Sequence, residues 1–384
     1  MTAQDTYWSQ LSTSMVDKII GDEFQLLESL GHGAYGCLFL GQSTQDNSYV
    51  AVKILPKSGL DLQQLQLQQL EIDIQSSLQH PNLLALHRVI QDTEFIYMVM
   101  ELCDQGDLFD FVIRDQDINP IREEHVVKKL FSQILDGVES MHATGVYHRD
   151  IKLENVLLKC EDEEDEDELT CKVADFGLAT RERYSMEFGC GSTSYLAPEH
   201  FFDEDKQELV PYDAAASDTW SLGILLLALM FGRNPWQEAS TADSAYVEFK
   251  RNPTMLKQQL FPELSSGAYQ LLVSVLASDG ADRLSIVEMK EQFLALDHLY
   301  ETQQKESPLT IPTITSKHTD ANSFDSAFFS GGNGSSWSDM VEEDEELARK
   351  SDYDTCTSPE ASHYDDDEDT EMFVHNGEKE SWWL

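Results

Sequence analysis

Short segments in which apolar and polar residues alternate open the main part of the chain. They read FQLLESLG (24–31), CLFLG (37–41) and YVAVKIL (49–55), and glycine separates them. A period near two predicts β-strands. In the segment 61–80, residues such as Leu70 and Ile74 instead lie three to five positions from the next apolar residue, which predicts one helix. We therefore expect a small β-rich lobe with one main helix.

From Gly106 to about Tyr300 the apolar patterns are longer and mostly helical, with short strand-like pieces at 156–158 and 172–174. The longest apolar run, Trp220 to Phe231, is shorter than the about 20 residues that a membrane span needs. We interpret it as a buried helix and expect no membrane partner. These patterns predict an α+β, two-lobed fold whose second lobe is larger and helical.

Differences in amino-acid composition divide the chain into three regions. We expect an N-terminal extension (1–23), one folded domain (24–300) and an acidic, disordered tail (301–384). Within the domain we expect lobes at about 24–100 and 104–300 and an acidic hairpin insertion at 160–170. The tail holds GGNGSS, EEDEE and DDDED and, at its aromatic end, SWWL. Such a segment buries too little apolar surface to offset the entropy cost of ordering.

Charge and cysteine content narrow the function classes. The formal net charge is −45 at pH 7, and no basic patch interrupts the acidic surplus, so we expect no nucleic-acid partner. Six cysteines without CxxC spacing indicate a reducing compartment. The first residues resemble no signal peptide. These observations predict a cytoplasmic or nuclear protein, or one present in both places.

A glycine motif and a lysine point to phosphate binding. The motif is GHGAYG, Gly31 to Gly36, and dinucleotide-binding folds use the same spacing. A dinucleotide fingerprint opens a helix, however, whereas here strand-like segments lie on both sides, which favours a hairpin folded over phosphates. Lys53, on the following predicted strand, can reach those phosphates. Glu71 on the predicted helix is the expected ion-pair partner of Lys53.

Three further motifs follow in order: HRDIKLEN (148–155), DFG (175–177) and APE (197–199). With the glycine motif and the lysine, they make the chain resemble eukaryotic serine/threonine protein kinases from about Phe24 to Tyr300. FGCGSTSYLAPE and the HRDIKxEN form are similar to fungal kinases that control nutrient responses and meiosis. The resemblance implies that the chain uses ATP and Mg²⁺ to phosphorylate proteins.

The resemblance also implies roles for single residues. Asp150 would orient the substrate hydroxyl, and Lys152, typical of serine/threonine kinases, would contact the γ-phosphate. Asn155 and Asp175 would supply metal ligands. Lys53, held by Glu71, would neutralise the α- and β-phosphates. The implied nucleotide-binding residues are Leu30, Gly31, Gly33, Gly36, Leu38, Ala51, Lys53, Met100, Glu101, Cys103, Asp107 and Leu157.

Two of these assignments leave alternatives open. The leucines of the implied adenine slot could equally be ordinary core residues. Asp107, which the resemblance assigns to the ribose, and Glu154 also occupy positions where related kinases use carboxylates to select basic residues before the acceptor. We therefore expect protein substrates with basic sites, although both carboxylates could instead face solvent. Two structural contacts are expected as well: Glu199 with Arg283, and Asp218 with the backbone of the catalytic loop.

The segment between DFG and APE departs from the family at its regulatory position. Phe188 stands where relatives carry a phosphorylated residue, and Glu187 beside it could present a permanent negative charge to Arg149. Ser192 replaces the usual threonine and keeps its hydroxyl. Gln75, four residues after Glu71, replaces an apolar residue that packs on the DFG phenylalanine. This last substitution puts the position of the helix in doubt and predicts low basal activity.

Eight consecutive carboxylates, Glu161 to Glu168, fall in the predicted hairpin insertion. They lack the glycine and ligand spacing of a calcium loop. A solvated insertion is one interpretation, and a docking surface for a basic partner is the other.

For the whole protein the alternatives to a protein kinase are an inactive scaffold and a kinase of small molecules or lipids. The complete set of motif residues opposes the first alternative. The APE segment opposes the second.

Overall fold

The computed structural model describes residues 3–33, 36–114, 121–160, 168–201 and 210–301. The carboxylates 161–167 and nearly all of the acidic tail lie outside the described residues, so the expectations for both stay predictions.

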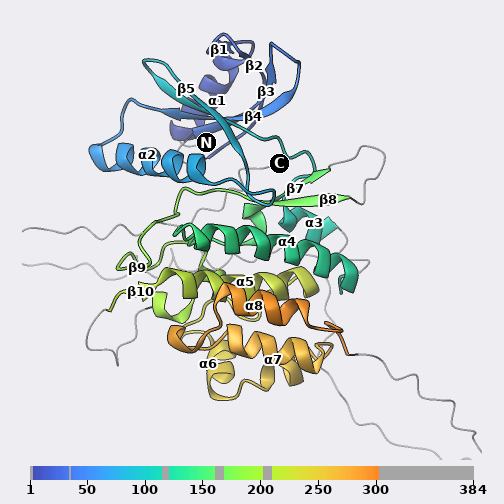
Figure 1. Cartoon of the computed structure of the whole chain (residues 1–384). Coiled ribbons are helices and arrows are strands. Elements are labelled where there is room, and N and C mark those ends of the chain that lie inside the picture. Colours follow the sequence, from blue (N-terminus) through green and yellow to red (C-terminus); the bar gives the residue numbers. More distant parts are fainter. Residues whose placement is uncertain (1–2, 34–35, 115–120, 161–167, 202–209, 302–384) are drawn as a thin grey trace, which may run out of the picture. The chain divides into compact units, whose positions relative to one another are not determined.

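The first lobe is an antiparallel sheet with the strand order β1-β2-β3-β4-β6-β5 (Figure 1). Its strands are β1 (Ile19–Ile20), β2 (Phe24–Gly33), β3 (Gly36–Ser43), β4 (Tyr49–Pro56), β5 (Leu86–Gln91) and β6 (Phe95–Met100). Side chains alternate between its two faces. On β4, for example, Ala51 and Leu55 face the cluster that contains Ile72 of α2, whereas Val52 and Ile54 belong to the cluster on the other face.

Helix α2 (Leu62–Ser77) is the main helix predicted for this lobe. It begins with a capping box, in which Asp61 accepts a hydrogen bond from the Gln64 N–H and the Gln64 side chain accepts one from the Asp61 N–H. Glu71, Ile72, Ile74 and Gln75 lie on its buried side. The helix therefore presents Glu71 and Gln75 to the interior of the domain.

Helix α1 (Ala3–Met15) covers the other face of the sheet, although the sequence predicted only an extension at 1–23. Trp8 and Met15 are 5% and 4% exposed and join the cluster that contains Phe39, Val52 and Tyr97. Trp8, Leu11 and Met15 share one helix face at spacings of three and four. Polar residues between them hide this pattern in the sequence.

The second lobe is built from helices around α5. Its helices are α3 (Leu108–Arg114), α4 (Glu124–Ala143), α5 (Ala214–Phe231), α6 (Ser244–Arg251), α7 (Ser266–Val275) and α8 (Ile286–Leu294). Two antiparallel strand pairs accompany them: β7 (Val156–Cys160) with β8 (Leu169–Val173), and β9 (Tyr184–Ser185) with β10 (Tyr212–Asp213). Among the described helices only α5 is long and apolar enough to cross a membrane, but 94% of it is buried inside the fold. It is the predicted core helix.

Backbone contacts join the two lobes beside α4. The Leu84 N–H donates to the Val173 carbonyl and the Val173 N–H donates to the Asn82 carbonyl, both at 2.9 Å. A Cβ atom on Gly137 of α4 would lie 2.7 Å from the Asn82 carbonyl oxygen, so glycine permits this close approach. The predicted two-lobed α+β fold is confirmed, and the segment 82–84 fixes the sheet of one lobe against the hairpin of the other.

Replacing Trp8 by alanine tests whether α1 is an integral part of the first lobe. We expect the free energy of unfolding to fall by about 3 kcal/mol, because the change empties a buried indole site. Chemical denaturation measures this change. Tyr7→Ala is the matched control, since Tyr7 on the same helix is 46% exposed and its loss should cost much less. Equal effects of the two substitutions would contradict the packing of α1.

Candidate active site

Lys53 on β4 and Glu71 on α2 form an ion pair between sheet and helix. The Lys53 Nζ lies 2.7 Å from Glu71 Oε1, so the predicted pair is present. The two side chains are only 14% and 11% exposed. Burial alone would lower the pKa of Lys53, but the charges of Glu71 and Asp175 and the hydrogen bond to Glu71 outweigh it and raise the pKa. Lys53 is therefore a firmly protonated cation.

The glycine motif lies at the turn of the β2–β3 hairpin. Gly33 pairs with Gly36, and Gly31 pairs with Leu38. A Cβ atom on Gly36 would lie 2.4 Å from the Ile54 carbonyl oxygen, so only glycine fits there. The motif thus joins two strands, as predicted for a hairpin that covers phosphates, and does not open a helix.

The apolar residues expected around an adenine ring come together from both lobes. One buried cluster holds Leu38, Ala51, Met100, Leu157 and Ala174, and Leu30 and Cys103 pack against it. A small cavity adjoins this cluster. Its lining residues are Leu38, Lys53, Glu71, Gln75, Leu84, Met100 and Asp175. The structure places the predicted residues side by side, and their role in nucleotide binding stays a prediction.

The carboxylate of Asp150 is held by four donors. Its Oδ1 accepts from the N–H and from the hydroxyl of Ser192, both at 3.0 Å. Its Oδ2 lies 3.0 Å from the Asn155 Nδ2 and 3.1 Å from the Lys152 Nζ. Lys152 also donates to the Ser192 hydroxyl at 2.8 Å, so this serine makes the contacts expected of the usual threonine. The network fixes the orientation of the carboxylate.

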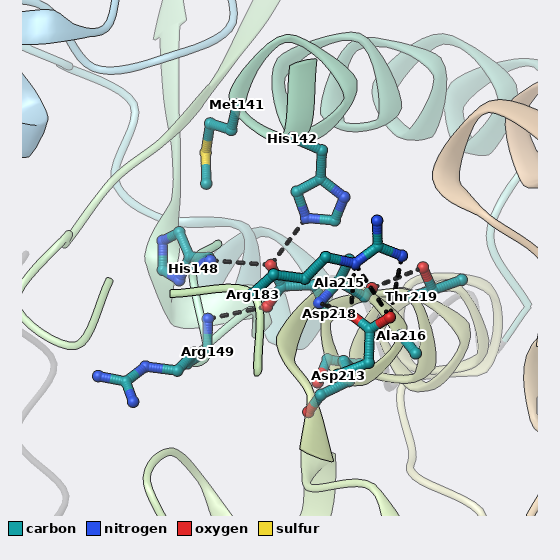
Figure 2. Close-up of polar contacts among 12 residues, drawn as sticks. Met141, His142, His148, Arg149, Arg183, Asp213, Ala215, Ala216, Asp218 and Thr219 are labelled. Carbon is teal, nitrogen blue, oxygen red and sulfur yellow. Dashed lines mark hydrogen bonds and ion pairs between the residues drawn. The ribbon is translucent and has the colours of Figure 1, made fainter. Parts of the chain in front are cut away.

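A second carboxylate, Asp218 of α5, holds the backbone of the catalytic loop (Figure 2). Its two oxygens accept the N–H groups of His148 and Arg149, both at 2.8 Å, and His142 Nε2 lies 2.9 Å away. Burial would raise the pKa of Asp218, but the hydrogen bond and charge of His142 lead the groups that lower it. The predicted anchoring contact is present. It stabilises Arg149 at a φ of 67°, which is unusual for a residue with a side chain.

Asn155 and Asp175 are the predicted metal ligands. The amide nitrogen of Asn155 donates to the Asp150 carbonyl at 2.8 Å and to its carboxylate at 3.0 Å, which leaves the amide oxygen as the metal donor. Asp175 has a φ of 61° and lines the cavity with Lys53 and Glu71. Magnesium prefers oxygen donors and usually combines one or two protein ligands with phosphates and water. These two residues therefore fit the ion.

Gln75 is buried, and its amide is satisfied. Its Nε2 donates to the Leu84 carbonyl at 3.2 Å and to the Met100 sulfur at 3.6 Å. The helix that carries Gln75 also keeps the Lys53–Glu71 pair intact. The position of the helix, which the sequence left in doubt, is fixed by a hydrogen bond from α2 to the segment before β5, and low basal activity stays a prediction. The sequence could not reveal this hydrogen bond, since the acceptor is a backbone carbonyl.

The carboxylates of Asp107 and Glu154 lie close enough to influence each other. Asp107 is 1% exposed, and its Oδ1 accepts the Asp110 N–H at 2.8 Å, so it caps the start of α3. Burial raises the pKa of Asp107 to about 6, and the charges of Asp110 and Glu154 add to the rise. The sequence missed this capping role. The ribose contact and the selection of basic substrates stay predictions.

The segment after DFG places Glu187 against Arg149. The Arg149 Nη1 lies 2.5 Å from Glu187 Oε2, and its Nε donates to the Leu178 carbonyl at 2.6 Å. Phe188 packs on Tyr212 with ring centroids 5.5 Å apart. The Glu187 carboxylate thus occupies the position that the sequence predicted for a permanent negative charge. The Phe188 ring packs against the ring of Tyr212 instead of facing Arg149.

Glu199 and Arg283 form the other predicted ion pair. Two parallel contacts of 2.6 Å join the guanidinium to the carboxylate, and the Arg283 side chain is fully buried. The guanidinium also lies over the ring of Trp220, 5.0 Å from its centroid. This pair connects the APE segment to the core of the second lobe.

Comparison with known proteins identifies the family. The model of the protein kinase domain family matches residues 24–294. The chain is 34% identical over 260 residues to the negative regulator of sexual conjugation and meiosis of Schizosaccharomyces pombe, covering 63% of this chain and 54% of that protein. It is also 34% identical over 282 residues to the serine/threonine-protein kinase ksp1 of the same yeast, covering 71% and 56%. The expected similarity to fungal meiosis-control kinases is confirmed.

A plant protein matches as well, the CBL-interacting serine/threonine-protein kinase 17 of Arabidopsis thaliana, at 32% identity over 274 residues, 70% of this chain and 58% of that protein. The chain spans little more than half the length of these curated relatives.

Replacing Gln75 by alanine tests the hydrogen bond between α2 and the segment before β5. The Leu84 carbonyl then loses a donor, and a cavity opens beside it. We expect the free energy of unfolding to fall by about 2 kcal/mol and amide exchange in α2 to accelerate. Denaturation and hydrogen exchange measure these effects. Gln79→Ala, at an exposed position after the same helix, serves as the control, and equal behaviour of both variants would refute the interpretation.

Proposed function

Because the chain belongs to the protein kinase family, we propose that it transfers the γ-phosphate of ATP to serine and threonine hydroxyls of proteins. One observation carries the proposal. Asp175 lines one cavity with Lys53 and Glu71. Its charge also raises the pKa of Lys152, whose Nζ lies 3.1 Å from the Asp150 carboxylate. Asp175 therefore joins the Lys53–Glu71 pair of one lobe to the Asp150 network of the other. A scaffold has no chemical need for this arrangement.

The contacts around Asp150 suit proton transfer from a hydroxyl group. In the transfer the bond from the γ-phosphorus to the bridging oxygen breaks and a bond to the substrate oxygen forms. The hydroxyl proton passes to the Asp150 carboxylate, which its four donors hold in place. Lys152 neutralises charge on the transferred group, and burial alone would lower its pKa, but Asp150, Glu154 and Asp175 raise it. Lys152 therefore remains a cation throughout.

The remaining residues bind and position the nucleotide. Lys53 contacts the phosphates, and the β2–β3 hairpin covers them with backbone N–H groups. Asn155 and Asp175 would hold Mg²⁺, which supplies charge neutralisation at the phosphates when bound. Lys152 two residues after Asp150 favours serine and threonine over tyrosine as acceptors. Two of the relatives, ksp1 and the CBL-interacting kinase 17, are named as serine/threonine-protein kinases.

We also propose that the substrates carry basic residues before the acceptor. Glu154 follows Lys152 by two positions and lies near the carboxylate of Asp107, so the two create a local negative potential. The strongly acidic chain would attract such peptides from a distance.

The activity test uses the full chain with labelled ATP, Mg²⁺ and an oriented peptide library. We expect transfer to serine and threonine peptides, enriched for arginine or lysine before the acceptor. Asp150→Asn should reduce kcat by at least about a hundredfold, and Glu154→Gln should weaken only the preference for basic peptides. Transfer to lipids or small molecules, or none to any acceptor, would refute the proposed function.

The Arg149–Glu187 contact predicts that activity requires no phosphate at position 188, and Tyr184, Ser185 and Thr193 are the other candidate phosphorylation sites of the segment. Glu187→Gln removes the charge but keeps the side-chain shape, and we expect kcat to fall about tenfold because Arg149 loses its counter-charge. Phosphatase treatment of the wild type should leave the rate unchanged. Glu182→Gln is the control, since Glu182 is an exposed carboxylate of the same segment. A large loss after phosphatase treatment would contradict the prediction.

A further inference from the structure

The segment 101–106, here called the hinge segment, links β6 to α3 and contacts both lobes. At its start the Glu101 N–H donates to the Ala85 carbonyl at 2.9 Å. At its end the Gln105 N–H donates to the Leu158 carbonyl at 3.1 Å, and the Leu158 N–H donates to the Gly106 carbonyl at 2.9 Å. Between these anchors, within the part of the chain that the structure describes, the Glu101 carbonyl and the Cys103 N–H and carbonyl have no backbone partner. These groups are therefore available to the edge of a ligand.

The side chain of Glu101 is fixed by two lysines of the second lobe. Its Oε1 lies 2.9 Å from the Nζ of Lys159 and 2.9 Å from the Nζ of Lys172. Lys172 is 8% exposed and Glu101 is 12% exposed. Burial would raise the pKa of Glu101, but hydrogen bonds from both lysines and their charges lower it. The contact is thus an ionised, largely buried triad.

Both lysines extend from one face of the β7–β8 hairpin. Lys172 pairs with Leu157 across the hairpin, and Lys159 follows Leu157 by two residues on the same strand. Alternation along a strand therefore places Lys159, Leu157 and Lys172 on the same face. Leu157 is fully buried in the cluster with Ala51 and Met100. One face of the β7–β8 hairpin thus carries Leu157, which lines the predicted adenine slot, and the two lysines that bind Glu101 of the hinge segment.

We propose that the Glu101–Lys159–Lys172 triad positions the hinge segment for adenine binding. The proposal rests on the proposed ATP-dependent function. The lysines set the distance between the backbone groups of Glu101 and Cys103 and the Leu157 floor, so that both contact the same planar ring. Glu101 and the lysines are positioning residues, since they act through the hinge backbone and touch no reacting atom. A misplaced hinge weakens binding of the base and leaves phosphate contacts intact.

The test measures dissociation constants of the full chain for adenosine, ADP and tripolyphosphate. We expect Lys172→Met to raise the dissociation constants of adenosine and ADP by a common factor, on the order of tenfold, and to leave that of tripolyphosphate unchanged. Lys172→Arg should restore most of the affinity. Lys290→Met is the matched control, because this lysine is also paired with two carboxylates, Asp136 and Glu139, but lies on α8.

A second variant distinguishes loss of hinge positioning from loss of the folded state. Glu101→Met combined with Lys172→Met removes the two buried charges and leaves Lys159, whose side chain is 29% exposed. Apolar replacement of a buried ion pair usually preserves folding. We expect this double variant to melt normally and still to bind adenosine weakly. In activity assays its KM for ATP should rise, whereas its kcat and its KM for peptide should change little.

Three results would overturn the inference. In the first, both variants fold and bind adenosine as tightly as the wild type. In the second, tripolyphosphate affinity falls by the same factor as adenosine affinity, which indicates general loosening. In the third, the wild type binds neither adenosine nor ADP, and the proposed function then fails as well. If the wild type binds adenosine and ADP and both variants bind them equally tightly, the positioning role of the triad is refuted, but the proposed ATP-dependent function is not.

Discussion

The buried carboxylate of Asp218 is the contact on which the geometry of the catalytic loop depends. It lies on α5, the most deeply buried helix of the second lobe, and it accepts the backbone N–H groups of two successive residues of that loop. Arg149 keeps a left-handed backbone conformation there, which costs free energy without such support. The apolar helix α5 thus positions the polar catalytic loop. Asp150 is the next residue after Arg149, so its backbone is positioned by the same contact.

In this strongly acidic chain, a few buried lysine and arginine side chains connect separate segments through ion pairs. Lys53, Arg149, Lys172 and Arg283 each bind a carboxylate on another segment of the chain, and each side chain is at most 14% exposed. Such pairs gain little net stability over apolar packing, but losing one partner leaves an uncompensated buried charge. Their value lies in fixing register between segments. The phosphate-binding and catalytic parts of the site therefore hold their places through charge, whereas the adenine slot combines apolar packing with the charges around Glu101.

The sequence predicted those contacts of the site for which the motifs and the family resemblance assign both partners. Lys53 with Glu71, Glu199 with Arg283 and Asp218 with the loop backbone are pairs of this kind. The alternation of β2 to β4 and the apolar run of α5 predicted the fold because their burial follows the simple period of a strand or a helix. The protein kinase domain family model matches residues 24–294, the region in which these patterns lie.

Contacts for which the family resemblance assigns no partner were beyond the sequence. Gln75 finds a carbonyl on a neighbouring segment, and Asp107 caps the helix that follows it. The Glu101 triad joins residues that are far apart in the chain, and no local spacing signals it. Helix α1 was missed because its apolar stripe is narrow and surrounded by serine, threonine and glutamine.

The carboxylate that neutralises Arg149 is encoded in the gene. Its charge is present as soon as the chain has folded, and no enzyme that removes phosphate can erase it. The charge available to Arg149 therefore lasts as long as the polypeptide, so synthesis and proteolytic turnover determine how long a cell contains it.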